Sequence, residues 1–131
     1  MIKKILLPID LRQPGAWQKT IDTAVDLARH HGAKLYVVAV VPKMERNLNV
    51  FPEDHKPDLE KFVGEKLPSD LEIESVLRAG SAHREIRAVA EELGIDLIVM
   101  HAQNPRLRDA VMGSNAANVV LHSPTSVYVV R

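Results

Sequence analysis

Short apolar runs that alternate with helix-like patterns restrict the fold of this chain more than any other feature. Residues 5–9 and 35–41 are almost wholly apolar, and so is the run Leu97-Ile98-Val99-Met100. Continuous apolar runs of this length are typical of strands buried on both faces of a parallel sheet. With turn residues as boundaries, the same reasoning predicts five strands, at 5–9, 35–41, 71–77, 96–100 and 127–130.

The segments between these predicted strands carry apolar residues at helical spacing. Such spacing predicts helices at 17–28, 59–63, 86–93 and beyond residue 113. Gly32 and Gly94 follow two of them as helix stops. The region 42–57 contains three prolines and is predicted to be a long loop.

Strands that alternate with helices indicate an α/β fold, a doubly wound parallel sheet with helices on both faces. Glutamates alternate with apolar residues in the segment 71–77, which is typical of a half-exposed edge strand, and 125–130 is predicted as the other edge. The first and fourth strands then lie at the centre. Ligands bind such sheets beyond the carboxyl ends of the central strands, which here means near Asp10 and His101.

Composition and charge limit the classes of partner. The chain has 131 residues, 17 basic and 17 acidic side chains and no cysteine. We therefore expect one domain over 1–131, no attraction to nucleic acid or to an anionic membrane, and no disulfide. No apolar run is long enough to span a membrane, and Met1 leads straight into a strand-like run instead of a cleavable signal, so the expected location is cytoplasmic.

An Ala/Val-rich segment with a helical pattern begins with Gly113, Ser114 and Asn115. Backbone N–H groups exposed at a helix start favour the binding of an anion, so this segment predicts a phosphate-binding site. Ser114 is also a favoured N-cap without any ligand, and the two interpretations are compatible. Arg106 and Arg108 could clamp phosphates, although loop arginines are usually only solvated.

Several segments in this order resemble the universal stress protein family. They are Lys4-Ile5-Leu6-Leu7-Pro8-Ile9-Asp10, Arg78-Ala79-Gly80-Ser81, Asp96-Leu97-Ile98-Val99-Met100 and Gly113-Ser114-Asn115 through Val127-Tyr128-Val129-Val130-Arg131. The resemblance spans the whole chain. It implies a five-stranded sheet ordered 3-2-1-4-5, frequent dimerisation and, in many members, ATP binding. It also implies a cytoplasmic protein linked to stress tolerance and signalling, without vigorous catalysis.

The chain departs from the glycine motif of the nucleotide-binding members. That motif has Gly, two residues, Gly, nine residues, then Gly followed by Ser or Thr. Here His101 and Asn104 replace the first two glycines, eight residues precede Gly113, and only Gly113-Ser114 remains. An imidazole at His101 could clash with the ligand or donate a hydrogen bond to it. A shortened loop ending in Gly-Ser-Asn is similar to that of a subgroup thought to keep nucleotide binding.

The resemblance assigns roles to further residues, each with a simpler alternative. Asp10 could accept hydrogen bonds from ribose or hold a phosphate-bound metal, or it could cap the following turn. The backbone of Val40 could contact and recognise adenine, or Val40 could simply belong to the hydrophobic core. The full set of expected nucleotide-binding residues is Pro8, Ile9, Asp10, Val40, Met100, His101, Asn104, Arg106, Gly113, Ser114 and Asn115.

Two functions stay open at this point. The protein is either an ATP-binding regulatory module, with or without magnesium, or a dimeric interaction protein that binds no nucleotide. No residue pattern indicates a metal site, a catalytic nucleophile or a Walker motif. The only enzymatic activity that could be expected is therefore slow hydrolysis of bound ATP. The unprotected edge at 125–130 predicts a homodimer.

Overall fold

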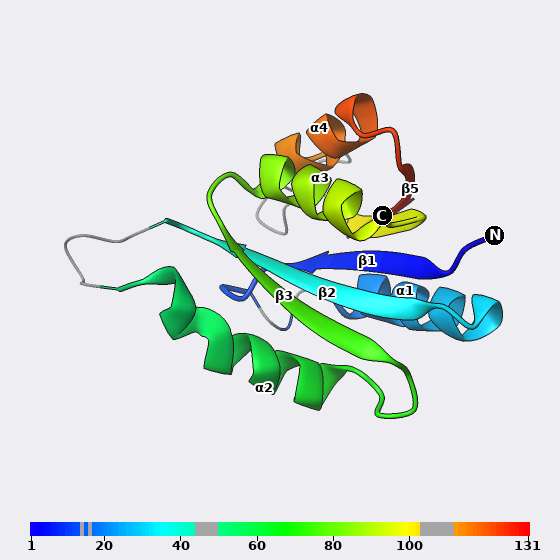
Figure 1. Cartoon of the computed structure of the whole chain (residues 1–131), viewed down its shortest axis with the longest axis horizontal. Coiled ribbons are helices and arrows are strands. Elements are labelled where there is room, and N and C mark those ends of the chain that lie inside the picture. The colour runs from blue at the N-terminus through cyan, green and yellow to red at the C-terminus, as the bar shows by residue number, and fades with distance from the viewer. Residues whose placement is uncertain (14, 16, 44–49, 103–111) are drawn as a thin grey trace.

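Five parallel strands form one sheet in the computed structural model, which describes residues 1–13, 15, 17–43, 50–102 and 112–131. The strands are β1 (Lys4–Ile9), β2 (Lys34–Val41), β3 (Ile73–Ala79), β4 (Leu97–His101) and β5 (Ser126–Val130). They lie in the order β3-β2-β1-β4-β5, and every neighbouring pair is parallel (Figure 1). The predicted fold class and strand order are confirmed.

Helices cover both faces of this sheet. They are α1 (Gln18–His31), α2 (Lys56–Lys66), α3 (Ala82–Leu93) and α4 (Ser114–His122), and a 3-10 turn η1 (Pro52–His55) precedes α2. Figure 1 shows α1 and α2 on one side of the sheet and α3 and α4 on the other. Alternate residues of each strand face opposite sides, so the sheet separates two apolar cores.

The two cores divide the buried residues of β1 between them. Leu7 packs with residues of α1 and α2, such as Ile21 and Phe62. Leu6 packs with residues of α3 and α4, such as Val89 and Val119. Both leucines have no exposed surface, which identifies β1 as a central strand buried on both faces.

Some element boundaries differ from the sequence prediction. β3 covers Ile73–Ala79 instead of 71–77, because its register pairs Ile73 with Leu35 and Ala79 with Val41. Pro57, expected in a loop, lies in the first turn of α2, where its missing N–H has no helical partner to lose. The helix stops Gly32 and Gly94 are confirmed, with left-handed φ values of 63° and 65°.

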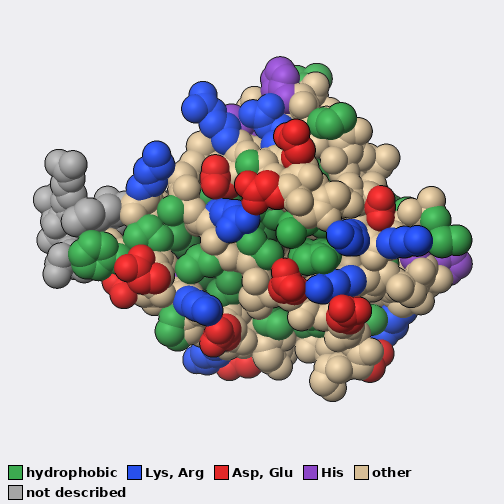
Figure 2. Space-filling view, viewed as in Figure 1, with side chains coloured by type: hydrophobic (Ala, Val, Ile, Leu, Met, Phe, Trp, Pro, Cys, Tyr) green, Lys and Arg blue, Asp and Glu red, His purple; other side chains and the backbone are tan. Residues whose placement is uncertain are grey.

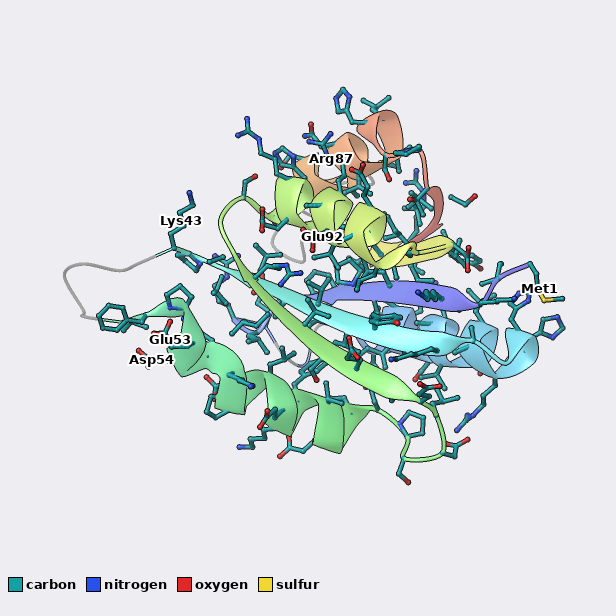
Figure 3. All side chains as sticks on the ribbon, viewed as in Figure 1. Met1, Lys43, Glu53, Asp54, Arg87 and Glu92 are labelled. Atoms are coloured by element: carbon teal, nitrogen blue, oxygen red, sulfur yellow. The ribbon has the colours of Figure 1, made fainter. Side chains whose placement is uncertain are left out.

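Charges of both signs are mixed over the surface. Figure 2 shows Lys and Arg side chains interspersed with Asp and Glu across the visible face. Figure 3 places labelled charged side chains around the periphery, with Arg87 and Glu92 on α3 and Glu53 and Asp54 at η1. Within the described ranges, no helix is both long and apolar enough to cross a membrane.

Candidate functional site

A cavity of about 280 Å³ opens beyond the carboxyl ends of β1 and β4. These two strands flank the point where the strand order reverses, which is the usual ligand site of a doubly wound sheet. The first turns of α1, α3 and α4 also reach the cavity, through Thr20, Ala82 and Ser114. Of the residues expected at the site, those that line the cavity are Pro8, Ile9, Asp10, Val40, His101, Gly113, Ser114 and Asn115.

Met100, which was also expected at the site, does not line the cavity. Met100 is 5% exposed, and its side chain packs in the core beneath α3 and α4. The next residue, His101, faces the side of α1 because successive side chains of a strand alternate between the two faces. Asn104 and Arg106 lie outside the described residues.

Among the described residues, no side chain caps the start of α4. Gly113 is the N-cap, in an extended conformation with φ −62° and ψ 156°, and Ser114 is the first helical residue. The interpretation of Ser114 as the N-cap was therefore wrong. Glycine has no side chain with which to cap, and the first intrahelical bond runs from the Ala117 N–H to the Gly113 carbonyl at 2.9 Å. The N–H groups of the first turn are thus available to an anion.

Backbone hydrogen bonds attach this helix start to the sheet. The Gly113 N–H donates to the Ala102 carbonyl at 2.6 Å, and the Ala102 N–H donates to the Val130 carbonyl at 2.8 Å. Ala102 is fully buried and directly follows β4. These bonds consequently fix the backbone N–H groups of the first turn of α4 relative to the ends of β4 and β5.

The carboxylate of Asp10 is engaged within its own loop. Its Oδ1 accepts from the Arg12 backbone N–H at 2.9 Å and from Nε at 3.0 Å, and its Oδ2 accepts from Nη2 at 3.0 Å. These hydrogen bonds, together with the negative charge of Asp10, raise the pKa of Arg12. The turn-capping alternative thus describes what Asp10 does in this structure. Sequence reasoning overlooked Arg12, which also lines the cavity.

His101 is held by two residues of the α1 start that sequence reasoning also overlooked. Its Nδ1 lies 3.1 Å from Thr20 Oγ1, and its ring centroid is 4.3 Å from that of Trp17, with 58° between the planes. Partial burial lowers the pKa of His101, and the charge of Lys19 lowers it further. A neutral imidazole therefore lines the cavity at pH 7.

The cavity has an apolar part as well as a polar one. Val40 at the end of β2, Ala82 at the start of α3 and Ile86 one turn later all line it. Val40 is half-buried and also packs against the core, so the two interpretations of this residue are compatible. Among the described residues, no group of three His, Cys, Asp or Glu side chains could hold a metal ion. The arrangement suits a ligand with an apolar part and an anionic group.

Comparison with known proteins identifies the family of this chain. The sequence matches the model of the Universal stress protein family over residues 1–131. Universal stress protein G of Shigella flexneri is 29% identical over 143 residues, covering 100% of both chains.

The fold is similar to the universal stress protein from Archaeoglobus fulgidus in complex with dAMP, with a TM-score of 0.74 at 23% identity and 100% coverage of both chains. It is also similar to a universal stress protein in complex with cAMP, with a TM-score of 0.75 at 20% identity, covering 99% of this chain and 97% of that one. Because the family model matches from the first residue to the last, the chain belongs to the universal stress protein family.

Proposed function

We propose that this universal stress protein binds an adenine nucleotide in the cavity, with ATP, alone or with magnesium, as its cofactor. The observation that carries the proposal is the start of α4, whose uncapped first turn lines the same cavity as the apolar residues of β2 and α3. Phosphate would occupy the α4 start and adenine would lie against Val40, Ala82 and Ile86. The similar structures that hold dAMP and cAMP support the choice of adenine.

We infer that the nucleotide serves regulation rather than rapid catalysis. Within the described residues, Asp10 is paired with Arg12, and neither Thr20 nor Ser114 forms a hydrogen bond to a carboxylate that could act as a base. At most, slow hydrolysis of bound ATP would follow. The protein would then act as a single cytoplasmic domain over 1–131 whose bound nucleotide alters a partner-binding surface in the stress response.

Nucleotide binding should be of modest affinity. One helix start and a few polar groups anchor the ligand, so we expect a dissociation constant in the micromolar range or weaker. Isothermal titration calorimetry with ATP and magnesium, and separately with AMP, measures it. Ligand at about a hundred times its dissociation constant should also stabilise the protein by roughly 2.7 kcal/mol and raise its unfolding temperature. Millimolar nucleotide that produces neither heat nor a thermal shift would exclude this function.

A homodimer is a second proposal, and the surface around β5 favours it. β5 pairs with β4 on one side only, and Tyr128 on this edge is 47% exposed. Val120 and Leu121 of α4 are 41% and 76% exposed. The opposite edge is different, because Glu74 of β3 and Glu72 just before it form ion pairs with Lys34 of β2. Charges protect one edge of the sheet, whereas an apolar surface accompanies the other.

Dimerisation through 125–130 should depend on Tyr128. We expect the wild type to sediment as a dimer at tens of micromolar and Tyr128→Arg to sediment as a monomer, since each copy of the seam would bury a charge. Phe51→Arg is the matched control, because Phe51 is 40% exposed but lies beside η1, away from β5. Val127 is a poorer test position, since its side chain packs against the core. A wild type that is monomeric at high micromolar concentration would contradict the dimer.

A further inference from the structure

The imidazole of His101 occupies a position where nucleotide-binding relatives are expected to have glycine, and the α1 start is built around it. Trp17 is the N-cap of α1, and Thr20 lies in the first turn of the same helix. Both side chains contact the His101 ring, and all three residues line the cavity. The hydrogen bond joins a side chain of β4 to one of α1 and occupies one of the two ring nitrogens. The contact with Thr20 therefore restricts the chemistry of the ring.

The hydroxyl of Thr20 and Nδ1 of His101 share one hydrogen bond, and the tautomer of the ring decides which of them donates. Thr20 is 1% exposed, and its Oγ1 has one hydrogen-bond partner among the described residues, His101 Nδ1 at 3.1 Å. If Nδ1 were protonated, the hydroxyl would accept, and its own buried proton would have no acceptor among the described residues, which is unfavourable. Donation from the hydroxyl to Nδ1 gives that proton an acceptor, and in this tautomer the single proton of the neutral ring is on Nε2.

The protonated nitrogen is the one that a ligand can reach. Nδ1 is directed to Thr20, and Nε2 has no hydrogen-bond partner among the described residues. Among the described residues, two buried side-chain nitrogens lack a hydrogen-bond partner, Trp17 Nε1 and His83 Nδ1. His101 Nε2 is not one of these buried atoms. His101 is partly exposed and lines the cavity together with the α4 start. The contact with the Trp17 ring restricts rotation of the imidazole, so its free N–H has a defined direction.

We propose that His101 donates a hydrogen bond from Nε2 to a phosphate oxygen of the bound nucleotide, and that Thr20 is the positioning residue that presets this donor. The proposal rests on the nucleotide function proposed above. A neutral donor is suited to this place, because partial burial and the charge of Lys19 both disfavour the protonated ring and lower the pKa of His101.

The role of Thr20 is testable without any ligand. Nitrogen-15 NMR of the histidine rings distinguishes the two neutral tautomers, and the wild type should show His101 protonated on Nε2. Thr20→Val removes the hydroxyl with little change of volume and should produce a detectable fraction protonated on Nδ1, whereas Thr20→Ser should restore the wild-type spectrum. Thr23→Val is the matched control, because the Thr23 hydroxyl donates to the Lys19 carbonyl and does not contact His101. A wild type protonated on Nδ1, or a Thr20→Val spectrum identical to the wild type, would overturn this role.

The donor role is tested by the affinity for AMP. His101→Phe keeps an aromatic ring beside Trp17 but has no N–H, and its AMP affinity should fall about tenfold, as expected for one hydrogen bond to a charged group. His101→Gln supplies an N–H and should recover part of this loss. Thr20→Val should weaken binding about threefold, in proportion to the lost fraction of the donor tautomer. The fluorescence of Trp17, the single tryptophan, offers a second readout.

The outcomes separate this inference from the nucleotide function. If His101→Phe binds AMP as tightly as the wild type or more tightly, the imidazole obstructs the site or is irrelevant to it, and the donor role is refuted while the function stands. If the wild type binds no AMP, the function and the donor role fail together, and the NMR experiment still decides the role of Thr20. Thermal unfolding of each variant distinguishes lost binding from lost folding.

Discussion

An Asn115→Asp protein should bind AMP at least tenfold more weakly than the wild type while unfolding at the same or a higher temperature. Asn115 is the second residue of α4 and lines the cavity. A carboxylate of nearly the same shape would interact favourably with the helix dipole, by about 0.3–1 kcal/mol. The same charge would repel a phosphate at the helix start, and a tenfold loss corresponds to about 1.4 kcal/mol. An unchanged or higher unfolding temperature together with weaker AMP binding would identify this helix start as the phosphate-binding site.

Asn118→Asp is the matched control for this experiment. It makes the same chemical change one helical turn further on, at a residue that does not line the cavity and whose Nδ2 donates to the Ser114 carbonyl at 2.8 Å. We expect its AMP affinity to fall much less, as measured by calorimetry at one ionic strength. Equal losses in both variants would indicate a general effect of charge. No loss in Asn115→Asp would place the phosphate elsewhere.

Leu6→Ala should reduce the free energy of unfolding by about 2–5 kcal/mol, a large fraction of the total for a domain of this size. Leu6 has no exposed surface, lies on the central strand β1 and pairs with Tyr36 of β2. The cavity left by the missing atoms would lie beneath α3 and α4, against residues such as Val89 and Val119. Urea unfolding followed by circular dichroism measures the loss.

The same substitution at an exposed leucine should have little effect. Leu121 of α4 is 76% exposed, and Leu121→Ala should change the unfolding free energy by less than about 0.5 kcal/mol. Both variants are best compared at low micromolar concentration, where association contributes least. A small loss in Leu6→Ala would mean that the core beneath α3 and α4 can collapse around a missing side chain.

Local patterns determined the elements and their arrangement. Apolar runs such as 35–41 and 97–100 had to be buried on both faces, and the glycines after two helices supplied left-handed stops. The half-exposed pattern of 71–77 indicated an edge, so β1 and β4 became central and the cavity lies beyond Asp10 and His101. These features could be inferred because each depends on residues that are close together in the chain.

Features that depend on pairing between distant segments were not predictable in this way. The bounds of β3 follow from its register with β2, which begins with Leu35 opposite Ile73. The N-cap of α4 depends on the hydrogen bond from Gly113 to Ala102, so the favourable capping propensity of Ser114 did not decide it. In both cases hydrogen bonding to another part of the sheet outweighed the local preference of a few residues.

The environment of the candidate site was decided by the tertiary structure alone. The sequence indicated that His101 stands at a strand end in place of a glycine, but its partner Thr20 is 81 residues away. Asp10 and Arg12 are close in sequence, yet only the folded loop turns the Arg12 guanidinium back onto the carboxylate. A residue type and its position along a strand follow from local periodicity, whereas its hydrogen-bond partner, protonation and charge depend on which surfaces the fold brings within a few ångströms.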